Sequence, residues 1–88
     1  MMSPCAFIVR MSRPLQTMAE IFDCLLNRDV KVKSMNLQCL NDLEGILILH
    51  CSMEKDRIRY TGHLLEKIRS VIEVEILQAQ SSNLKKLQ

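Results

Sequence analysis

The sequence is poor in aromatic residues. Of its 88 residues, one is Tyr, two are Phe and none is Trp. Proteins that hold single-stranded nucleic acid stack bases on aromatic side chains, and RNA-recognition sheets carry these on their central strands. Phe7 is the one aromatic residue in a segment that we expect to be such a strand. The scarcity argues against nucleic-acid binding by stacking.

Long hydrophobic runs are also missing. No apolar run approaches the roughly 20 residues that span a bilayer. The apolar run from Ala6 to Val9 is too short for the core of a signal peptide, and no basic residue precedes it. We therefore expect no membrane association and a cytoplasmic location.

A surplus of either charge is lacking as well. The chain has 12 Lys and Arg residues against 10 Asp and Glu, a net charge of +2. Lys85 and Lys86 account for this difference, so the remainder of the chain is neutral. Because proteins that bind nucleic acid usually present a basic face, the charge balance predicts no nucleic-acid partner.

The four cysteines lack the spacing of a metal site. Cys5, Cys24, Cys39 and Cys51 include no C-x-x-C pair, and neither His50 nor His63 stands at zinc-finger spacing. Scattered thiols of this kind are most often small buried hydrophobic side chains. We expect no bound metal.

No arrangement of catalytic residues is visible. The two histidines are isolated and the acidic residues are scattered over positions that we expect to face solvent. The loop from Met11 to Leu15 has no cysteine, which argues against a copper-chaperone module. We expect no catalytic residues, and therefore no enzyme activity from this chain alone.

The hydrophobic pattern changes period along the chain. Alternation or continuous apolar character predicts strands at 5–11, 30–40, 46–51 and 72–77, with the face of the second strand switching at a bulge near Lys33. In the last strand, Ile72, Val74 and Ile76 should face inward. Turn residues fill 41–45. We expect one domain at 5–78 and a polar, flexible tail at 79–88.

Helical spacing predicts two helices. Leu15, Met18, Phe22 and Leu25 form one apolar stripe on a helix that Ser12 can cap and that ends near Arg28. A second helix follows Ser52, which can cap it, and carries Ile58, Leu65 and Ile68. Gly62 within that helix predicts close approach of another backbone.

The order strand, helix, strand, strand, helix, strand predicts an α+β, ferredoxin-like βαββαβ fold. Right-handed crossovers give an antiparallel sheet in the order 4-1-3-2, with both helices on one face. The central strands, first and third, should be apolar on both sides. Charges on the other two strands, such as Lys31, Lys33, Glu73 and Glu75, fit sheet edges.

The third strand points to a contact surface. Ile46 and Ile48 face one side of the sheet, and Leu47 and Leu49 face the other, although helices cover only one side. Uncovered apolar area in a protein usually marks a contact. We therefore expect a partner interface at one of these two pairs. The exposed edge of the second strand adds a reason to expect a homodimer.

Two segments resemble a known family, the ACT domains of the small regulatory subunits of acetohydroxyacid synthase (acetolactate synthase). Val32-Lys33-Ser34-Met35-Asn36 resembles their second-strand signature. Leu65 to Val74 resembles their pattern L-x-K-L-x-D-V-x-x-V at the end of the second helix. The likeness extends from Phe7 to Gln80 and is strongest to the short form of the subunit.

The resemblance implies where an effector would bind. Amino-acid-binding ACT domains usually have a Gly in the loop after the first strand, and the matching residue here looks like Gln16. Valine-sensing subunits have Asn where Arg13 and Lys31 stand here. The effector-binding residues, if there are any, would be Arg13, Leu15, Gln16, Thr17, Lys31 and Val32. The departures favour weak or absent valine binding.

The resemblance thus implies a non-catalytic subunit that regulates or activates a catalytic large subunit in branched-chain amino acid biosynthesis. That partner would carry thiamine diphosphate, Mg and FAD, whereas this chain would hold no cofactor. Two alternatives stay open: a stand-alone ACT-type sensor of an amino acid, and a ligand-free ACT-like interaction module.

Overall fold

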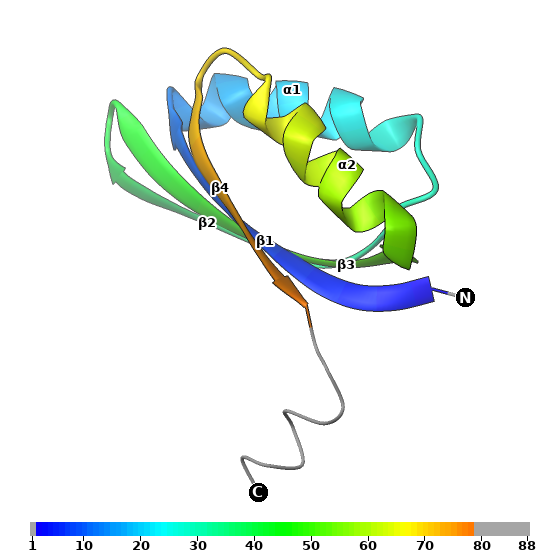
Figure 1. The fold of residues 1–88 in the computed structure, drawn as a ribbon. Coiled ribbons are helices and arrows are strands. Elements are labelled where there is room, and N and C mark those ends of the chain that lie inside the picture. The colour runs from blue at the N-terminus through cyan, green and yellow to red at the C-terminus, as the bar shows by residue number, and fades with distance from the viewer. Residues whose placement is uncertain (1, 79–88) are drawn as a thin grey trace, which may run out of the picture.

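A four-stranded antiparallel sheet forms one layer of the molecule and two helices form the other, in a computed structural model that describes residues 2–78 (Figure 1). The ferredoxin-like βαββαβ fold is therefore confirmed. The sheet order β2-β3-β1-β4 is the predicted order 4-1-3-2 read from the other edge. The predicted tail at 79–88 lies outside the described residues. The elements are β1 (Met2–Ser12), α1 (Pro14–Leu26), β2 (Lys31–Asn41), β3 (Glu44–Glu54), α2 (Lys55–Glu66) and β4 (Val71–Gln78).

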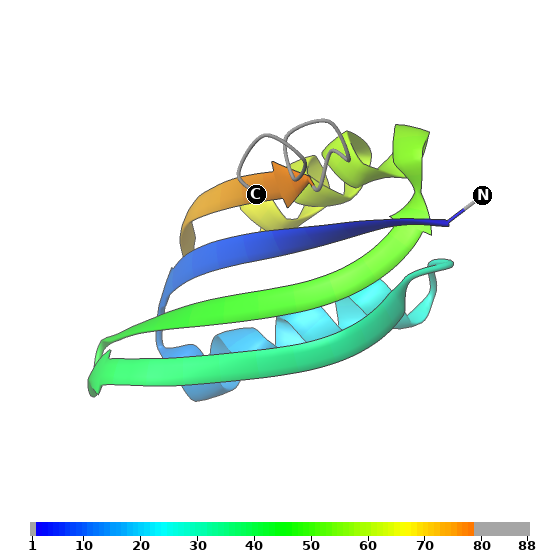
Figure 2. The same ribbon diagram turned by 90° about the horizontal axis from the view of Figure 1, so that it is seen from below.

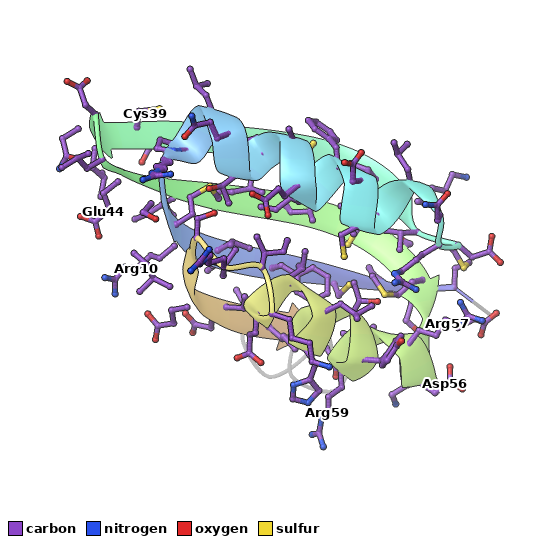
Figure 3. The ribbon with its side chains drawn as sticks, turned by 90° about the horizontal axis from the view of Figure 1, so that it is seen from above. Arg10, Cys39, Glu44, Asp56, Arg57 and Arg59 are labelled. Carbon is purple, nitrogen blue, oxygen red and sulfur yellow. The ribbon has the colours of Figure 1, made fainter. Side chains whose placement is uncertain are left out.

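Both helices lie on the same face of the sheet. In Figure 3, α1 covers the half formed by β2 and β3, and α2 covers the half formed by β1 and β4. Figure 2 shows the opposite face, which no helix covers. Neither helix in the described part of the chain is long and apolar enough to cross a bilayer.

Alternate residues of the two central strands form the core. Phe7 pairs with Leu49 and Val9 with Leu47 across β1 and β3, and all four side chains are fully buried beneath the helices. β1 and β3 are flanked on both sides over most of their length, β1 from Cys5 to Met11 and β3 from Glu44 to Ser52. The other members of the core are Cys5, Met11, Ile21, Leu25, Cys51, Met53, Ile58 and Leu65.

β2 and β4 form the edges, as predicted. The register of β2 against β3 shifts between Val32 and Ser34, which confirms the predicted bulge at Lys33. Beyond the bulge, Met35 and Leu37 face the helices and pack against the core. The outer side of β2 pairs with no strand in the described residues.

Neither predicted serine caps a helix. Ser52 is buried within β3, which continues past the predicted end because β1 and β2 flank it on both sides. Helix α2 starts at Lys55 instead. Before α1 the cap residue is Arg13, whose φ of 49° is uncommon for a side-chain-bearing residue. The Ser12 hydroxyl donates to the Ser70 carbonyl oxygen at 3.2 Å and is therefore engaged elsewhere.

Both glycines leave room for a close neighbour, which is a side chain at Gly62 and both a side chain and the Gln38 carbonyl oxygen at Gly45. A Cβ at Gly62 would lie 2.6 Å from Ile76 Cδ1, so α2 approaches a side chain of β4 and not a backbone as predicted. A Cβ at Gly45 would lie 2.8 Å from Pro14 Cβ. Gly45 belongs to β3, and the turn before it is shorter than predicted.

One inward position in β4 was predicted wrongly. Ile72 is exposed because the register of β4 against β1 shifts next to Met11, where Val71 becomes the paired residue. Val71, Val74 and Ile76 pack against the core instead.

The apolar stripe of α1 also differs from the prediction. The buried residues are Pro14, Thr17, Ile21 and Leu25. Leu15 and Phe22, which we expected in the buried stripe, are exposed together with Leu26. The helix therefore has two apolar stripes, one turned into the core and one turned outward.

Candidate functional site

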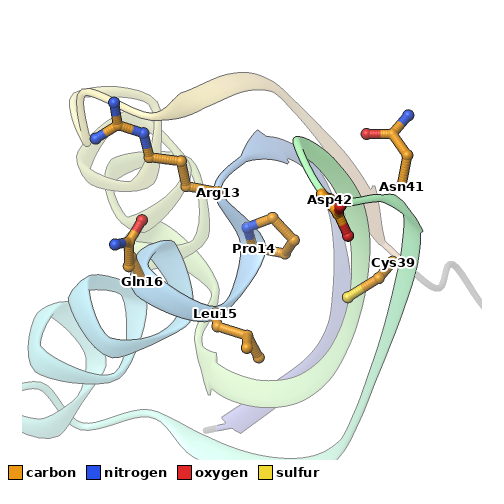
Figure 4. A pocket seen from close by; sticks show the side chains of 7 residues that line it. All are labelled: Arg13, Pro14, Leu15, Gln16, Cys39, Asn41 and Asp42. Atoms are coloured by element: carbon orange, nitrogen blue, oxygen red, sulfur yellow. The ribbon is translucent and has the colours of Figure 1, made fainter.

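Three of the predicted effector residues gather at the start of α1. Arg13, Leu15 and Gln16 line a cavity of about 380 Å³ between this helix and the β2–β3 hairpin (Figure 4). Leu15 and Cys39 point into the same space from opposite sides. The other lining residues are Pro14, Asn41 and Asp42. The walls therefore combine apolar side chains with one cation and one carboxylate.

A second cavity lies on the other side of Arg13 and Gln16. Its volume is about 560 Å³, and Glu20 and Arg69 contribute charges of opposite sign to its wall. Ser12 and Ser70 complete the lining. Arg13 and Gln16 thus line both cavities, and both of these side chains are exposed.

Thr17 does not line either cavity. Its side chain is fully buried, and its hydroxyl donates to the Ser12 carbonyl oxygen at 2.6 Å. The Thr17 hydroxyl oxygen also lies 2.7 Å from Ser70 Oγ, with which it forms a second hydrogen bond. The Ser12 backbone N–H donates to the Ser70 carbonyl oxygen at 2.8 Å. Thr17 therefore ties α1 to the end of β1 and the start of β4. Its side chain is not accessible from either cavity, and its place among the effector-binding residues stays a prediction.

The remaining two predicted residues lie at the opposite end of β2. Lys31 lines a cavity of about 420 Å³ with Met2, Arg28, Asp29, Val30 and Glu54. Val32 is its exposed neighbour in the same strand. The Arg28 guanidinium makes a cation–π contact with Tyr60, 5.8 Å from the centre of its ring. A single chain therefore does not bring the six predicted effector residues to one place.

Two of the four cysteines are buried in the core, where their thiols act as packing groups. Cys5 and Cys51 lie in the core with their sulfur atoms 3.6 Å apart. Burial raises the pKa of the Cys5 thiol and raises that of Cys51 to about 12. Since the thiolate is the nucleophile, neither is suited to attack a substrate. The other two cysteines differ from our expectation, because Cys24 is only partly buried and Cys39 is exposed.

Histidine and acidic residues form no group that could bind a metal. Within residues 2–78, no three His, Cys, Asp or Glu side chains come together in a way that could hold an ion. His63 Nδ1 lies 3.2 Å from Glu66 Oε1 on the solvent side of α2. This pair is one helical turn apart and exposed, which is typical of a surface interaction.

The helix-free face of the sheet is defined by residues that point away from α1 and α2. Ile46 and Ile48 of β3 point to this face, where Ile48 lies beside Ile8 and is 38% exposed. Arg10 marks one end, with ion pairs of 3.4 Å to Glu44 and 3.2 Å to Glu73. Leu47 and Leu49 are fully buried on the opposite side. Of the two predicted pairs, only Ile46 and Ile48 are therefore available for a partner.

The sequence analysis missed the outward stripe of α1. Leu15, Phe22 and Leu26 are 78%, 45% and 75% exposed, respectively. The signal was present in the sequence, because these residues follow each other at intervals of seven and four, which places them on one side of a helix. A single helix with apolar residues over so wide an arc predicts a second contact in addition to the core.

Solved structures match the chain in fold. The ACT domain of GTP pyrophosphokinase from Chlorobium tepidum superimposes with a TM-score of 0.72, covering 88% of this chain and 100% of that domain at 13% identity. The C-terminal domain of the MgtC protein from Mycobacterium tuberculosis gives a TM-score of 0.71, covering 91% and 90% at 14% identity. This chain has the fold of an ACT domain.

Other comparisons show that this likeness is limited to the fold. An unknown protein from Galdieria sulphuraria gives a TM-score of 0.77 at 16% identity, covering 91% of this chain and 46% of that one. No family model and no curated protein matches the sequence. Identities this low establish the ACT-type fold alone, and the function must be argued from the surfaces.

Proposed function

We propose that this chain is a non-catalytic regulatory subunit that acts through contact with a larger catalytic protein. The observation that carries the proposal is the helix-free sheet face, where Ile46 and Ile48 lie uncovered. An apolar area of this kind favours a protein contact. The neighbouring Glu73 and Glu75 outnumber Arg10, so we expect basic side chains around the matching patch on the partner.

The catalytic protein that we favour is the large subunit of acetohydroxyacid synthase. Support comes from the two segments that resemble the small subunits of this enzyme. Val32 to Asn36 contains the bulge of β2, and Leu65 to Val74 joins the end of α2 to β4. The partner would hold thiamine diphosphate, Mg and FAD, and would condense pyruvate with a second 2-keto acid.

The proposed action is a shift between two states of the partner. A subunit without catalytic residues can change a rate only by binding one conformation of the enzyme better than another. The sheet offers a continuous surface for this role, because β1 and β3 pair over their whole length beside Ile46 and Ile48. This chain would thereby raise the activity or the stability of the large subunit.

The test is reconstitution with the large subunit, with acetolactate formation as the readout. The chain alone should not consume pyruvate, and the mixture should exceed the large subunit alone. Ile48→Asp should abolish the increase, because it places a charge in the buried contact. Leu43→Asp is the matched control, since Leu43 is an exposed apolar residue at the tip of the β2–β3 hairpin. Full activity of the large subunit without this chain, or with Ile48→Asp, would refute the proposal.

A second candidate, an amino-acid sensor, is favoured by the two cavities beside Arg13 and Gln16. They lie at the first turn of α1, where backbone N–H groups and the helix dipole favour a carboxylate. Saturable binding of an amino acid by the isolated chain would favour this role over the partner-only role.

A further inference from the structure

The outer edge of β4 pairs with no strand in the described part of the chain. Only β1 contacts the backbone of β4, and from Glu73 to Gln78 this pairing runs without a register shift. The backbone N–H and C=O groups that point away from β1 are therefore open over this range. Extended segments of partner proteins add to a sheet at edges of this kind, through main-chain hydrogen bonds.

A groove of about 270 Å³ lies between this edge and α2, on the helix side of the sheet. Val74 and Ile76 line it from the strand, and both stay only partly buried although they pack against the core. Gly62 lines it from α2, where a Cβ would meet Ile76. Arg59, at the rim, lies on the side of α2 that is turned away from α1 (Figure 3). Apolar side chains of an added strand would complete the burial of Val74 and Ile76.

The other side of β4 is acidic. Glu73 and Glu75 point to the helix-free face, opposite Arg10 and Ile8 of β1. Glu73 pairs with Arg10 at 3.2 Å, whereas Glu75 forms no ion pair with any of the described residues. Glu75, Ile8 and Ile48 stand in one row across β4, β1 and β3. The acidic edge is therefore continuous with the apolar area that we propose as the partner contact.

We propose that β4 binds an extended basic segment of a partner protein, which adds to the sheet as a fifth strand. The inference rests on the proposed function for the identity of that partner, the catalytic protein, and adds the way in which it holds the sheet. The added strand runs antiparallel to β4, because antiparallel pairing is slightly more stable per residue than parallel pairing.

The side chains of β4 define the pattern of the added strand. Residues of the partner that stand opposite Glu73 and Glu75 are Lys or Arg, because unlike charges directly opposite each other stabilise a strand pair. The residues between them point to the helix side, where the groove beside Val74 and Ile76 takes apolar side chains. The segment therefore alternates basic and apolar residues, with a period of two.

The charges also decide which edge of the sheet such a segment selects. Charged side chains on an edge strand limit the strands that can pair with it. Glu73 and Glu75 attract a basic strand and repel an acidic one, whereas Lys31 and Lys33 of β2 repel a basic strand. A segment that alternates basic and apolar residues therefore fits β4 and not β2.

The first test uses the chain without any catalytic protein and two capped peptides with the length of β4, which is 8 residues. One peptide alternates Val and Lys, and the other has the same composition with all Val before all Lys. Amide hydrogen exchange followed by NMR is the readout. The alternating peptide should slow exchange in β4 from Glu73 to Gln78 and leave β2 unchanged. Protection of β2 instead of β4, or equal effects of the two peptides, would overturn the proposal.

The second test is a charge reversal, measured with the alternating peptide and in reconstitution with the large subunit of acetohydroxyacid synthase. Glu75→Lys should weaken peptide binding about tenfold and raise the concentration of this chain needed for half-maximal activation by a similar factor. Glu20→Lys is the matched control, because Glu20 is an exposed acid on α1. Equal activation by the Glu75→Lys variant and the wild type would refute the added strand and leave the proposed function intact. Selective peptide binding at β4 without activation by the wild type would leave the strand site standing and refute only the regulatory role.

Discussion

Cys5 and Cys51 are directly paired residues of β1 and β3, and their sulfur atoms lie 3.6 Å apart in the core. Neither sulfur can be charged there at low cost, because burial removes the solvent that would stabilise a thiolate. The contact between the two thiols therefore makes the stability of the central strands depend on pH under alkaline conditions.

We predict that these thiols lower the stability of the fold at high pH. Folding raises the pKa of Cys51 from its ordinary value of 9.0 to about 12, and the pKa of Cys5 moves in the same direction. Between these values the unfolded chain binds fewer protons than the folded chain, so the free energy of unfolding falls as pH rises from about 9 to about 12. Below pH 9 the thiols contribute no slope.

Urea midpoints measured from pH 7 to pH 11 are the check. Cys51→Ala removes the most strongly shifted group and should flatten the alkaline slope, although it lowers stability at pH 7 through the lost packing. Cys39→Ala is the control, because Cys39 is exposed. An equally steep slope in Cys51→Ala would show that other groups cause the alkaline loss.

The hydroxyl of Thr17 gives a second prediction. Thr17→Val keeps the shape of the side chain but leaves the Ser12 carbonyl oxygen and the Ser70 hydroxyl without this partner. We expect a loss of about 1–3 kcal/mol in the free energy of unfolding. Thr17→Ser retains the hydroxyl and loses one methyl group, so its cost should be smaller. Chemical denaturation of both variants decides the point: a larger loss in Thr17→Ser would assign the role to packing.

The contact between Gly62 and Ile76 gives a third prediction. Gly62→Ala gains up to about 1 kcal/mol of helix propensity, but its methyl group meets Ile76 Cδ1 at 2.6 Å, and overpacking costs about 1–3 kcal/mol. We expect net destabilisation. Ile76→Val removes the opposing atom, so Gly62→Ala should be neutral or stabilising in that background. A double-mutant cycle with additive effects would contradict this account of the glycine.

Much of the fold could be predicted because strand and helix periods leave different patterns. The charges of Lys31 and Glu73 distinguished edges from centre without any knowledge of packing. The buried side of α1 could not be predicted in the same way. Leu15 and Leu25 both satisfy helical spacing, and only the position of the sheet beneath the helix decides that Leu25 is buried and Leu15 exposed.

The helix-free sheet face and the cavity by α1 could be predicted from the sequence only in part. Alternation showed that Ile48 and Leu49 face opposite sides, but the side that the helices cover follows from tertiary packing against Phe7. The separation of Gln16 from Lys31 was likewise hidden, because a strand of 11 residues carries its two ends far apart. The resemblance placed both residues in one effector site, whereas a single chain holds them beside two separate cavities at opposite ends of β2.

The last prediction concerns valine. Arg13 and Gln16 stand at the cavity by α1, where the resemblance would place an Asn and a Gly. The Gln16 side chain occupies room that a glycine would leave for close approach of a ligand to the backbone. The resemblance places Lys31 where a sensing subunit has an Asn, and a positive charge near an amino acid's ammonium group is unfavourable at short range. We therefore expect weak or no binding.

Calorimetry with valine, leucine and isoleucine up to millimolar concentration is the measurement. Saturable binding with a Kd below about 100 µM, near −5.5 kcal/mol, would refute the prediction. The double variant Gln16→Gly, Lys31→Asn restores two of the missing residues and should bind valine more tightly than the wild type. Lys33→Asn is the control for the change in charge alone. An improvement in both variants would assign the effect to net charge, whereas an improvement confined to the double variant would show that these positions hold back effector binding.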